Sequence, residues 1–382
     1  MRIAILGTRG IPNHYGGYDQ YAEFLAVGLA QRGYEVVVYN SHNHPYQKST
    51  WNNISIVHIY DSEFKYGSLG RFVYNLKCVQ DLKKRNCDVI FQLDYTTLSL
   101  WNFLIPKKMA VVTFMDNLKG KQISHAKLMS NYLNYAEKLA AKHSDYLISD
   151  SEKVSIYLEK TYGKSSTLIP YAVDVFTQPN EQALHTFDVL PYQYDLLIAR
   201  IVAENELELI LDGVVKANTY RPFLVIGNNN TLYGYELREK YKNYPQIRFL
   251  GGIHDRDTRD NLRYYSNLYF HANTTSSTNA FLLNAMSANS LIVARNNILN
   301  ASILGKDGFY FDNTKDVTLL LLSVTKNDVE YQSHLAANIK KIKEVYNWDR
   351  SLDLYENVFR NINAKKTSPS VLGKFTGHSI NG

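Results

Sequence analysis

Residues 2–39 read RIAILGTRGIPNHYGGYDQYAEFLAVGLAQRGYEVVVY, and this stretch decides the class of the fold. It begins with an apolar run at residues 2–7, which is typical of a buried strand. A loop containing several glycines follows, and apolar residues then recur every four positions over residues 21–29, as on one face of a helix. Residues 35–39 form the next apolar run. A strand–helix–strand unit of this kind predicts a parallel sheet covered by helices on both faces.

The same pattern restarts in the second half of the chain. Residues 195–199 form an apolar run, 206–216 a helical pattern, and 223–227 a second apolar run that ends in glycine. Further strands are predicted at residues 54–59, 89–92, 110–114, 146–148, 247–250, 268–271 and 290–294. The sequence therefore predicts an α/β protein with two doubly wound, Rossmann-like domains that face a cleft, where ligands bind at the carboxyl ends of the strands.

The boundaries of these domains follow from the change of pattern along the chain. We expect a first domain at residues 1–175 and a second at residues 176–345. An aromatic-rich helix is predicted at residues 346–363. Residues 364–382 contain the polar run KKTSPS, which predicts a disordered tail.

Composition and charge restrict the classes of function. Hydrophobic residues make up 45% and charged residues 20% of the chain, as in soluble globular proteins. The net charge of +6 favours an anionic substrate or membrane surface, but no arginine-rich run or motif indicates nucleic acid. Cys78 and Cys87 belong to no CxxC pair, so no zinc site is expected. No signal-peptide pattern or long apolar run is present, which predicts a cytoplasmic protein.

Residues 269–286 carry the clearest sign of a binding site. An apolar strand end runs into the small, hydroxyl-rich loop 273–279, which leads directly into a helix. Such a loop offers unpaired backbone N–H groups and the positive end of a helix dipole. The segment therefore predicts a site for a phosphate group or a sugar hydroxyl.

Four motifs in order give the chain a resemblance to a known family. They are residues 7–17 (GTRGIPNHYGG), 200–209 (RIVAENELEL), 278–286 (TNAFLLNAM) and 347–349 (NWD). Together they resemble the signatures of GT-B glycosyltransferases of the retaining family 4 type, in the branch that includes bacterial polysaccharide rhamnosyltransferases. The resemblance covers nearly the whole chain, and it implies that the final helix crosses back onto the first domain.

The resemblance implies a metal-independent transferase that needs no cofactor and binds its nucleotide-diphosphate sugar in the cleft. Gly16 and Gly17 would let the backbone approach the donor phosphate. The expected catalytic residues are Arg200, which would bind the diphosphate and stabilise the leaving group, and Asp116, as acceptor base or sugar contact. A helix cap is the alternative role for Asp116. The other expected donor-binding residues are Asn205, His271, Ser276, Ser277, Thr278, Asn279 and Asn284.

The chain departs from the family at two important positions. The paired glutamates of the family correspond to Ser276 and Asn284. A neutral hydrogen bond contributes about 1 kcal/mol and a charged one about 1.5–3 kcal/mol, so this loss would weaken donor binding roughly tenfold to a few hundredfold. Three alternatives stay open: an active sugar transferase, a catalytically degenerate homologue that binds glycan or acts as a scaffold, and a sugar-nucleotide epimerase or phosphorylase.

The leading expectation is a hexosyltransferase-type enzyme of bacterial surface polysaccharide or capsule synthesis. It would move a sugar from a dTDP- or UDP-linked donor to a glycan or lipid-diphosphate-linked acceptor, and rhamnose is the expected sugar by analogy alone. Because such acceptors lie in the membrane, we also expect peripheral contact of the basic first domain with the inner face of the cell membrane. The basic residues in question are Lys83, Lys84, Arg85, Lys107, Lys108, Lys119, Lys121 and Lys127.

Overall fold

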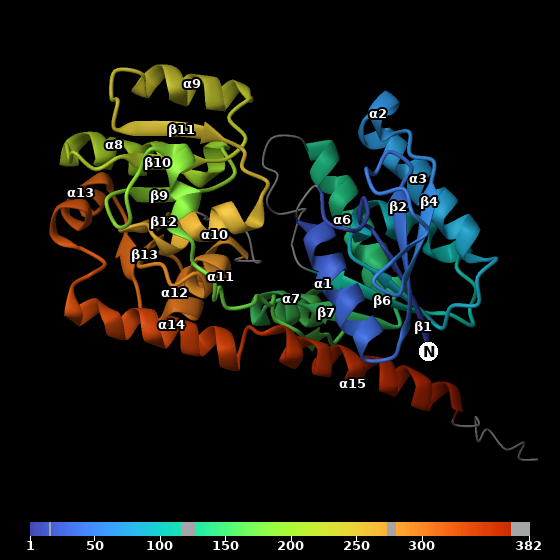
Figure 1. The fold of residues 1–382 in the computed structure, drawn as a ribbon. Helices are drawn as coiled ribbons and strands as arrows, with labels where there is room; N and C mark the ends of the chain where they lie inside the picture. The colour runs from blue at the N-terminus through green and yellow to red at the C-terminus, as the bar shows by residue number, and fades with distance from the viewer. Residues whose placement is uncertain (15–16, 116–126, 273–279, 368–382) are drawn as a thin grey trace, which may run out of the picture.

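The computed structural model describes residues 1–14, 17–115, 127–272 and 280–367. Within them the chain forms two α/β domains that stand side by side (Figure 1). Each domain has one sheet, and almost every strand pair in it is parallel. The predicted fold class is therefore confirmed.

The first domain is built on an eight-stranded sheet in the order β3-β4-β2-β1-β5-β6-β7-β8, and only the β3–β4 pair is antiparallel among the described strands. Its strands are β1 (Arg2–Leu6), β2 (Glu35–Ser41), β3 (Thr50–Trp51), β4 (Ile54–Ile59), β5 (Val89–Gln92), β6 (Ala110–Met115), β7 (Tyr146–Ser149) and β8 (Thr167–Leu168). Its helices are α1 (Tyr18–Gln31), α2 (Glu63–Tyr66), α3 (Ser68–Leu82), α4 (Tyr95–Leu98), η1 (Ser99–Leu104), α6 (Lys127–His143) and α7 (Glu152–Tyr162). The central strands are apolar on both sides because helices cover both faces.

The second domain repeats this plan with a six-stranded parallel sheet in the order β11-β10-β9-β12-β13-β14. Its strands are β9 (Asp195–Ile198), β10 (Phe223–Ile226), β11 (Ile247–Gly251), β12 (Tyr269–His271), β13 (Ile292–Arg295) and β14 (Phe309–Phe311). Its helices are η2 (Glu181–Phe187), η3 (Ala203–Asn205), α8 (Leu207–Ala217), α9 (Leu232–Tyr241), α10 (Arg256–Tyr264), α11 (Ala280–Ser287), α12 (Ile298–Leu304), α13 (Thr314–Ser323), η4 (Val329–Tyr331) and α14 (Gln332–Glu344).

Strand order reverses once in each sheet. In the first sheet the chain moves outward from β1 to β2 and later returns to β5 on the other side of β1. In the second it moves from β9 to β10 and β11 and later returns to β12. A crevice opens beyond the carboxyl ends of the strands at such a reversal, and ligands of open α/β sheets bind there. The loops after β1, β9 and β12 are therefore the places to look for a site.

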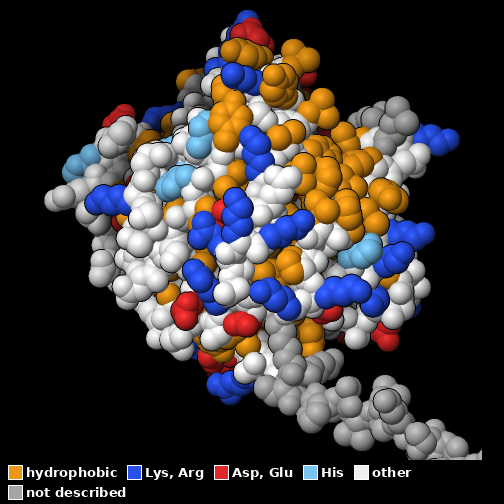
Figure 2. Space-filling view, turned by 90° about the vertical axis from the view of Figure 1, so that its right-hand side faces the viewer, with side chains coloured by type: hydrophobic (Ala, Val, Ile, Leu, Met, Phe, Trp, Pro, Cys, Tyr) orange, Lys and Arg blue, Asp and Glu red, His pale blue; other side chains and the backbone are white. Residues whose placement is uncertain are grey.

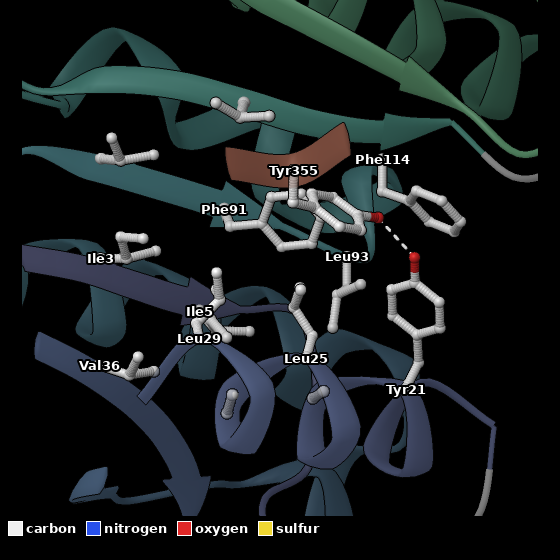
Figure 3. Packing of buried hydrophobic residues seen from close by; sticks show 14 of the residues in the cluster. Ile3, Ile5, Tyr21, Leu25, Leu29, Val36, Phe91, Leu93, Phe114 and Tyr355 are labelled. Atoms are coloured by element: carbon white, nitrogen blue, oxygen red, sulfur yellow. Dashed lines mark hydrogen bonds between the residues drawn. The ribbon is translucent and has the colours of Figure 1, made fainter. Parts of the chain in front are cut away.

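The last helix, α15 (Trp348–Thr367), packs against the first domain rather than the second (Figure 1). Its Tyr355 enters the core beside Phe91, and the hydroxyl groups of Tyr355 and Tyr21 form a hydrogen bond (Figure 3). Burial raises the pKa of both tyrosines, so the pair stays neutral. The two ends of the chain therefore build one core.

The helix also extends further than the sequence pattern suggests. We predicted a disordered tail from residue 364, whereas α15 remains helical to Thr367. Lysine has good helix propensity, so the polar composition of this stretch did not mark the end of the helix. Residues 368–382 lie outside the described part of the chain.

Candidate functional site

The two domains enclose a cleft between α1 and α10, with a volume of about 740 Å³. Its wall on the first domain comes from the loop after β1 and from α1, and its wall on the second comes from the loop after β11 and from α10. Figure 1 shows α1 and α10 on the facing sides of the two domains. The lining residues are Arg9, Pro12, Asn13, His14, Gln20, Glu23, Phe24, His254, Asp255, Arg256 and Arg259.

Buried side chains hold the loop after β1 in place. The Asp19 carboxylate accepts the Arg9 backbone N–H at 2.8 Å and also the Thr8 hydroxyl. Asn40 accepts the Ile11 N–H at 3.1 Å and donates to the Ile11 carbonyl at 2.8 Å. Burial raises the pKa of Asp19, whereas the bonds from Thr8 and Arg9 oppose that shift. The loop is therefore a preorganised wall of the cleft.

Gly17 stands at the N-terminus of α1, where the sequence predicts contact with the donor phosphate. Its φ of 60° lies in the left-handed region, and a Cβ at this position would meet nothing within 4 Å. Glycine adopts this conformation without steric cost and leaves the first amide groups of the helix open to a ligand. The geometry is compatible with the predicted role, which stays a prediction. Gly16 lies outside the described residues.

Arg200 follows β9 directly, at the reversal of strand order in the second sheet. Its side chain is exposed, and it forms no ion pair within the described residues. Asn205 is buried, and its Nδ2 donates to the Arg200 carbonyl at 2.8 Å. This bond holds the turn that carries Arg200, and the expected contact of Asn205 with the donor stays a prediction.

The other predicted donor residues gather near β12 and α11. His271 ends β12 and is 1% exposed, so its ring lies within the protein. Asn284 is half-buried in α11, and its Nδ2 donates to the Ala280 carbonyl one turn earlier at 2.8 Å. The predicted residues Asp116, Ser276, Ser277, Thr278 and Asn279 lie outside the described residues.

The sequence analysis missed the contribution of α10 to the cleft. This helix begins at Arg256, with Asp255 as its cap, where the Asp255 carboxylate accepts the Thr258 N–H at 2.7 Å. Arg256 reaches across the cleft, and its guanidinium carbon lies 5.1 Å from the centre of the Phe24 ring on α1. The spacing of Arg256, Arg259 and Arg263 on one helical face was the available signal.

No group of three or more side chains suited to hold a metal ion occurs in the described ranges. The arginine side chains that line this cleft favour an anion. The cleft is therefore suited chemically to a phosphate-bearing ligand.

Comparison with known proteins places this fold among sugar-transferring enzymes. A family described as a domain of unknown function, DUF1972, matches residues 1–174. No protein of curated function matches the sequence. The structure is similar to that of sucrose-phosphate synthase from Thermosynechococcus elongatus, at 15% identity and a TM-score of 0.76, over 95% of this chain and 99% of the other.

Two further structures show the same likeness. HepE of Anabaena, solved with UDP and glucose, is 16% identical with a TM-score of 0.71, over 95% of this chain and 100% of the other. WaaG, a glycosyltransferase involved in lipopolysaccharide biosynthesis, is 15% identical with a TM-score of 0.68, over 96% of this chain and 100% of the other. These neighbours are GT-B glycosyltransferases, and the fold of this chain is GT-B.

Proposed function

We propose that this protein is a glycosyltransferase that moves a sugar from a nucleotide-diphosphate donor to a glycan or a lipid-linked glycan. Arg200 is the observation that carries the proposal. It presents an exposed guanidinium at the strand-order reversal of the second sheet, and Asn205 holds its backbone. A cation there would bind the diphosphate and neutralise the charge that develops on the leaving group.

The donor and the pathway rest on the comparisons and on the sequence resemblance. A UDP- or dTDP-linked donor agrees with the UDP found in HepE, and a role in surface polysaccharide synthesis agrees with the description of WaaG. Rhamnose rests on the sequence resemblance alone. Retention of the anomeric configuration and independence from metal rest on it as well.

A thermal-shift series with UDP, dTDP, GDP and CMP tests the nucleotide site. A ligand at about 100 times its dissociation constant adds about 2.7 kcal/mol of stability, which raises the melting temperature measurably. We expect one nucleoside diphosphate to produce this shift. If none of the four does so at millimolar concentration, the proposal of a nucleotide-sugar donor is wrong.

A degenerate homologue that binds glycan without transferring sugar is the second candidate. Asn284 favours it, because a neutral amide with its N–H group bound within α11 replaces a carboxylate of the family. This candidate predicts glycan binding without nucleotide binding, so the same thermal-shift series separates it from the first.

We also propose that the first domain docks on an anionic membrane through an apolar face, defined by Leu69, Val73, Phe103, Met129 and Tyr135. Leu69 and Phe103 are 72% and 68% exposed. The face spans three elements, because Trp101 of η1 donates to the Phe72 carbonyl of α3 at 3.1 Å and Tyr132 of α6 packs 5.7 Å from the Phe72 ring. Figure 2 shows the side of the molecule on which α2 and α3 lie, with apolar side chains gathered beside lysine and arginine.

The segments that carry this apolar face are basic, which suits an anionic surface. Residues 63–85, 99–109 and 127–143 contain eleven Lys and Arg but only three Asp and Glu. The remainder of the chain contains 31 Lys and Arg against 33 Asp and Glu, so the positive net charge comes from these segments. The three acids are already engaged. Glu63 pairs with Arg9 and Arg71, Asp81 with Arg85, and Glu137 accepts the Tyr157 and Tyr162 hydroxyls. No described helix has the length and the apolar character to cross a bilayer.

Vesicle sedimentation tests this docking. Replacing Leu69 and Phe103 by serine removes two inserting side chains, so we expect about tenfold weaker binding to phosphatidylglycerol vesicles. The matched control replaces Leu232 and Ile298, which are 80% and 87% exposed on the second domain, and should bind as the wild type does. Equal binding by both double variants, or no binding by the wild type at low salt, would disprove the proposal.

A further inference from the structure

Arg256, Arg259 and Arg263 lie on one face of α10, and two of them, Arg256 and Arg263, form ion pairs with the same residue, Asp260. Asp260 uses both carboxylate oxygens, because Oδ1 accepts from Arg263 at 2.6 Å and Oδ2 lies 3.3 Å from Arg256 Nε. Arg259 stands between these two arginines and lines the cleft. Its side chain forms no hydrogen bond or ion pair with the part of the chain that the structure describes, and its Nε is enclosed.

An unbalanced cation in this position is costly. Burial and then the neighbouring Arg263 lower the pKa of Arg259, and the nearby Asp260 and Asp255 offset this shift only in part. Arginine nevertheless keeps its proton in proteins. A half-buried charge without a partner therefore destabilises the protein until an anion lies beside it.

The opposite wall of the cleft adds further positive charge. Arg9 lines it from the first domain and shares its Glu63 partner with Arg71. Glu23 also lines the cleft, but its carboxylate accepts the Asn13 N–H. Asp255 lines the cleft as well, and its carboxylate accepts the Thr258 N–H. Arginines of both domains thus face one space that is large enough for a phosphorylated group.

This space is separate from the position of Arg200. Arg200 follows β9, whereas α10 follows β11, and β10 lies between these two strands. Two strand spacings place the strand ends about 10 Å apart. Arg200 is not among the residues that line the cleft between α1 and α10.

We propose that Arg259, with Arg256 and Arg9, forms a second anion site that binds a phosphate or diphosphate group of the acceptor between the two domains. The description of the ligand as an acceptor rests on the proposed transferase function, whereas the anion site rests on the arginine cluster alone. Guanidinium groups bind phosphate oxygens through paired, charge-assisted hydrogen bonds. An acceptor held in this way would draw α1 and α10 together.

Isothermal titration with inorganic pyrophosphate tests the site. We expect the wild type to bind pyrophosphate, and Arg259→Gln to bind it roughly ten- to a hundredfold more weakly, because one charge-assisted contact is lost. Arg238→Gln is the matched control. Arg238 lies on α9 of the same domain, with its guanidinium 4.5 Å from the Tyr235 ring, and its loss should leave the affinity unchanged.

A second arm separates this site from the donor site. With the nucleotide from the thermal-shift series present at saturation, pyrophosphate should still bind, and Arg259→Gln should keep its nucleotide affinity. Complete competition would show that pyrophosphate occupies the donor site, and equal binding by Arg259→Gln would show that Arg259 holds no anion. If Arg259→Gln folds poorly, Arg259→Lys replaces it in the test. This variant keeps the charge and should retain part of the affinity. Loss of the nucleotide shift with pyrophosphate binding intact would overturn only the proposed function.

Discussion

Arg200→Ala is expected to weaken nucleoside-diphosphate binding roughly ten- to a hundredfold. The exposed guanidinium forms no ion pair with another described residue, so its removal should change the stability of the fold little. The bound ligand, in contrast, loses one charged contact. If transfer occurs, the loss in kcat should exceed the loss in affinity, because charge on the leaving group grows in the transition state. Titration with the nucleotide that stabilises the wild type measures the first effect.

Two further variants make this result specific. Arg200→Lys keeps the charge but loses the paired geometry, so it should fall between the wild type and Arg200→Ala. Asn205→Ala leaves the guanidinium in place but removes the 2.8 Å bond to the Arg200 carbonyl, so it should lower affinity less than Arg200→Ala does. An Arg200→Ala protein that binds every nucleotide as the wild type does would contradict the assignment of the donor site.

Trp348→Ala is expected to lower the free energy of unfolding by about 3–5 kcal/mol, the usual cost of deleting a buried tryptophan. Trp348 begins α15 and is 7% exposed. Its ring stacks on Phe24 at 5.2 Å and lies 5.3 Å from Tyr21, so it fastens α15 to α1. Urea unfolding followed by circular dichroism measures the loss.

Trp348→Phe provides the matched comparison. The indole N–H is buried and has no hydrogen-bond partner within the described residues, so phenylalanine keeps an aromatic ring and removes an unsatisfied donor. We expect it to lose much less stability than alanine does. Equal losses for the two variants would show that stacking does not fasten the helix. Because Phe24 also lies below Arg256, Trp348→Ala should disturb the cleft as well.

Elements with a strong apolar period were predictable to within a residue or two. β4 and β5 have the predicted bounds, since the run of β-branched and aromatic residues begins and ends with the strand. The start of α10 at Arg256 was not predicted, because residues 256–260 are polar throughout and show no apolar stripe. The face of α10 that lines the cleft is charged, so a search for periodic apolar residues does not detect it.

The sequence by itself determined the two-domain α/β architecture, the strand-end loops and the candidate Arg200, since local period and short motifs encode all three. The tertiary structure alone decided which residues act together. Tyr21 meets Tyr355 across 334 positions of the chain, Arg256 lies over Phe24, and Asn205 turns inward to the Arg200 backbone. These contacts depend on how the domains pack. Whether a charged side chain such as Arg259 has an ion-pair partner also depends on the neighbours that the fold supplies.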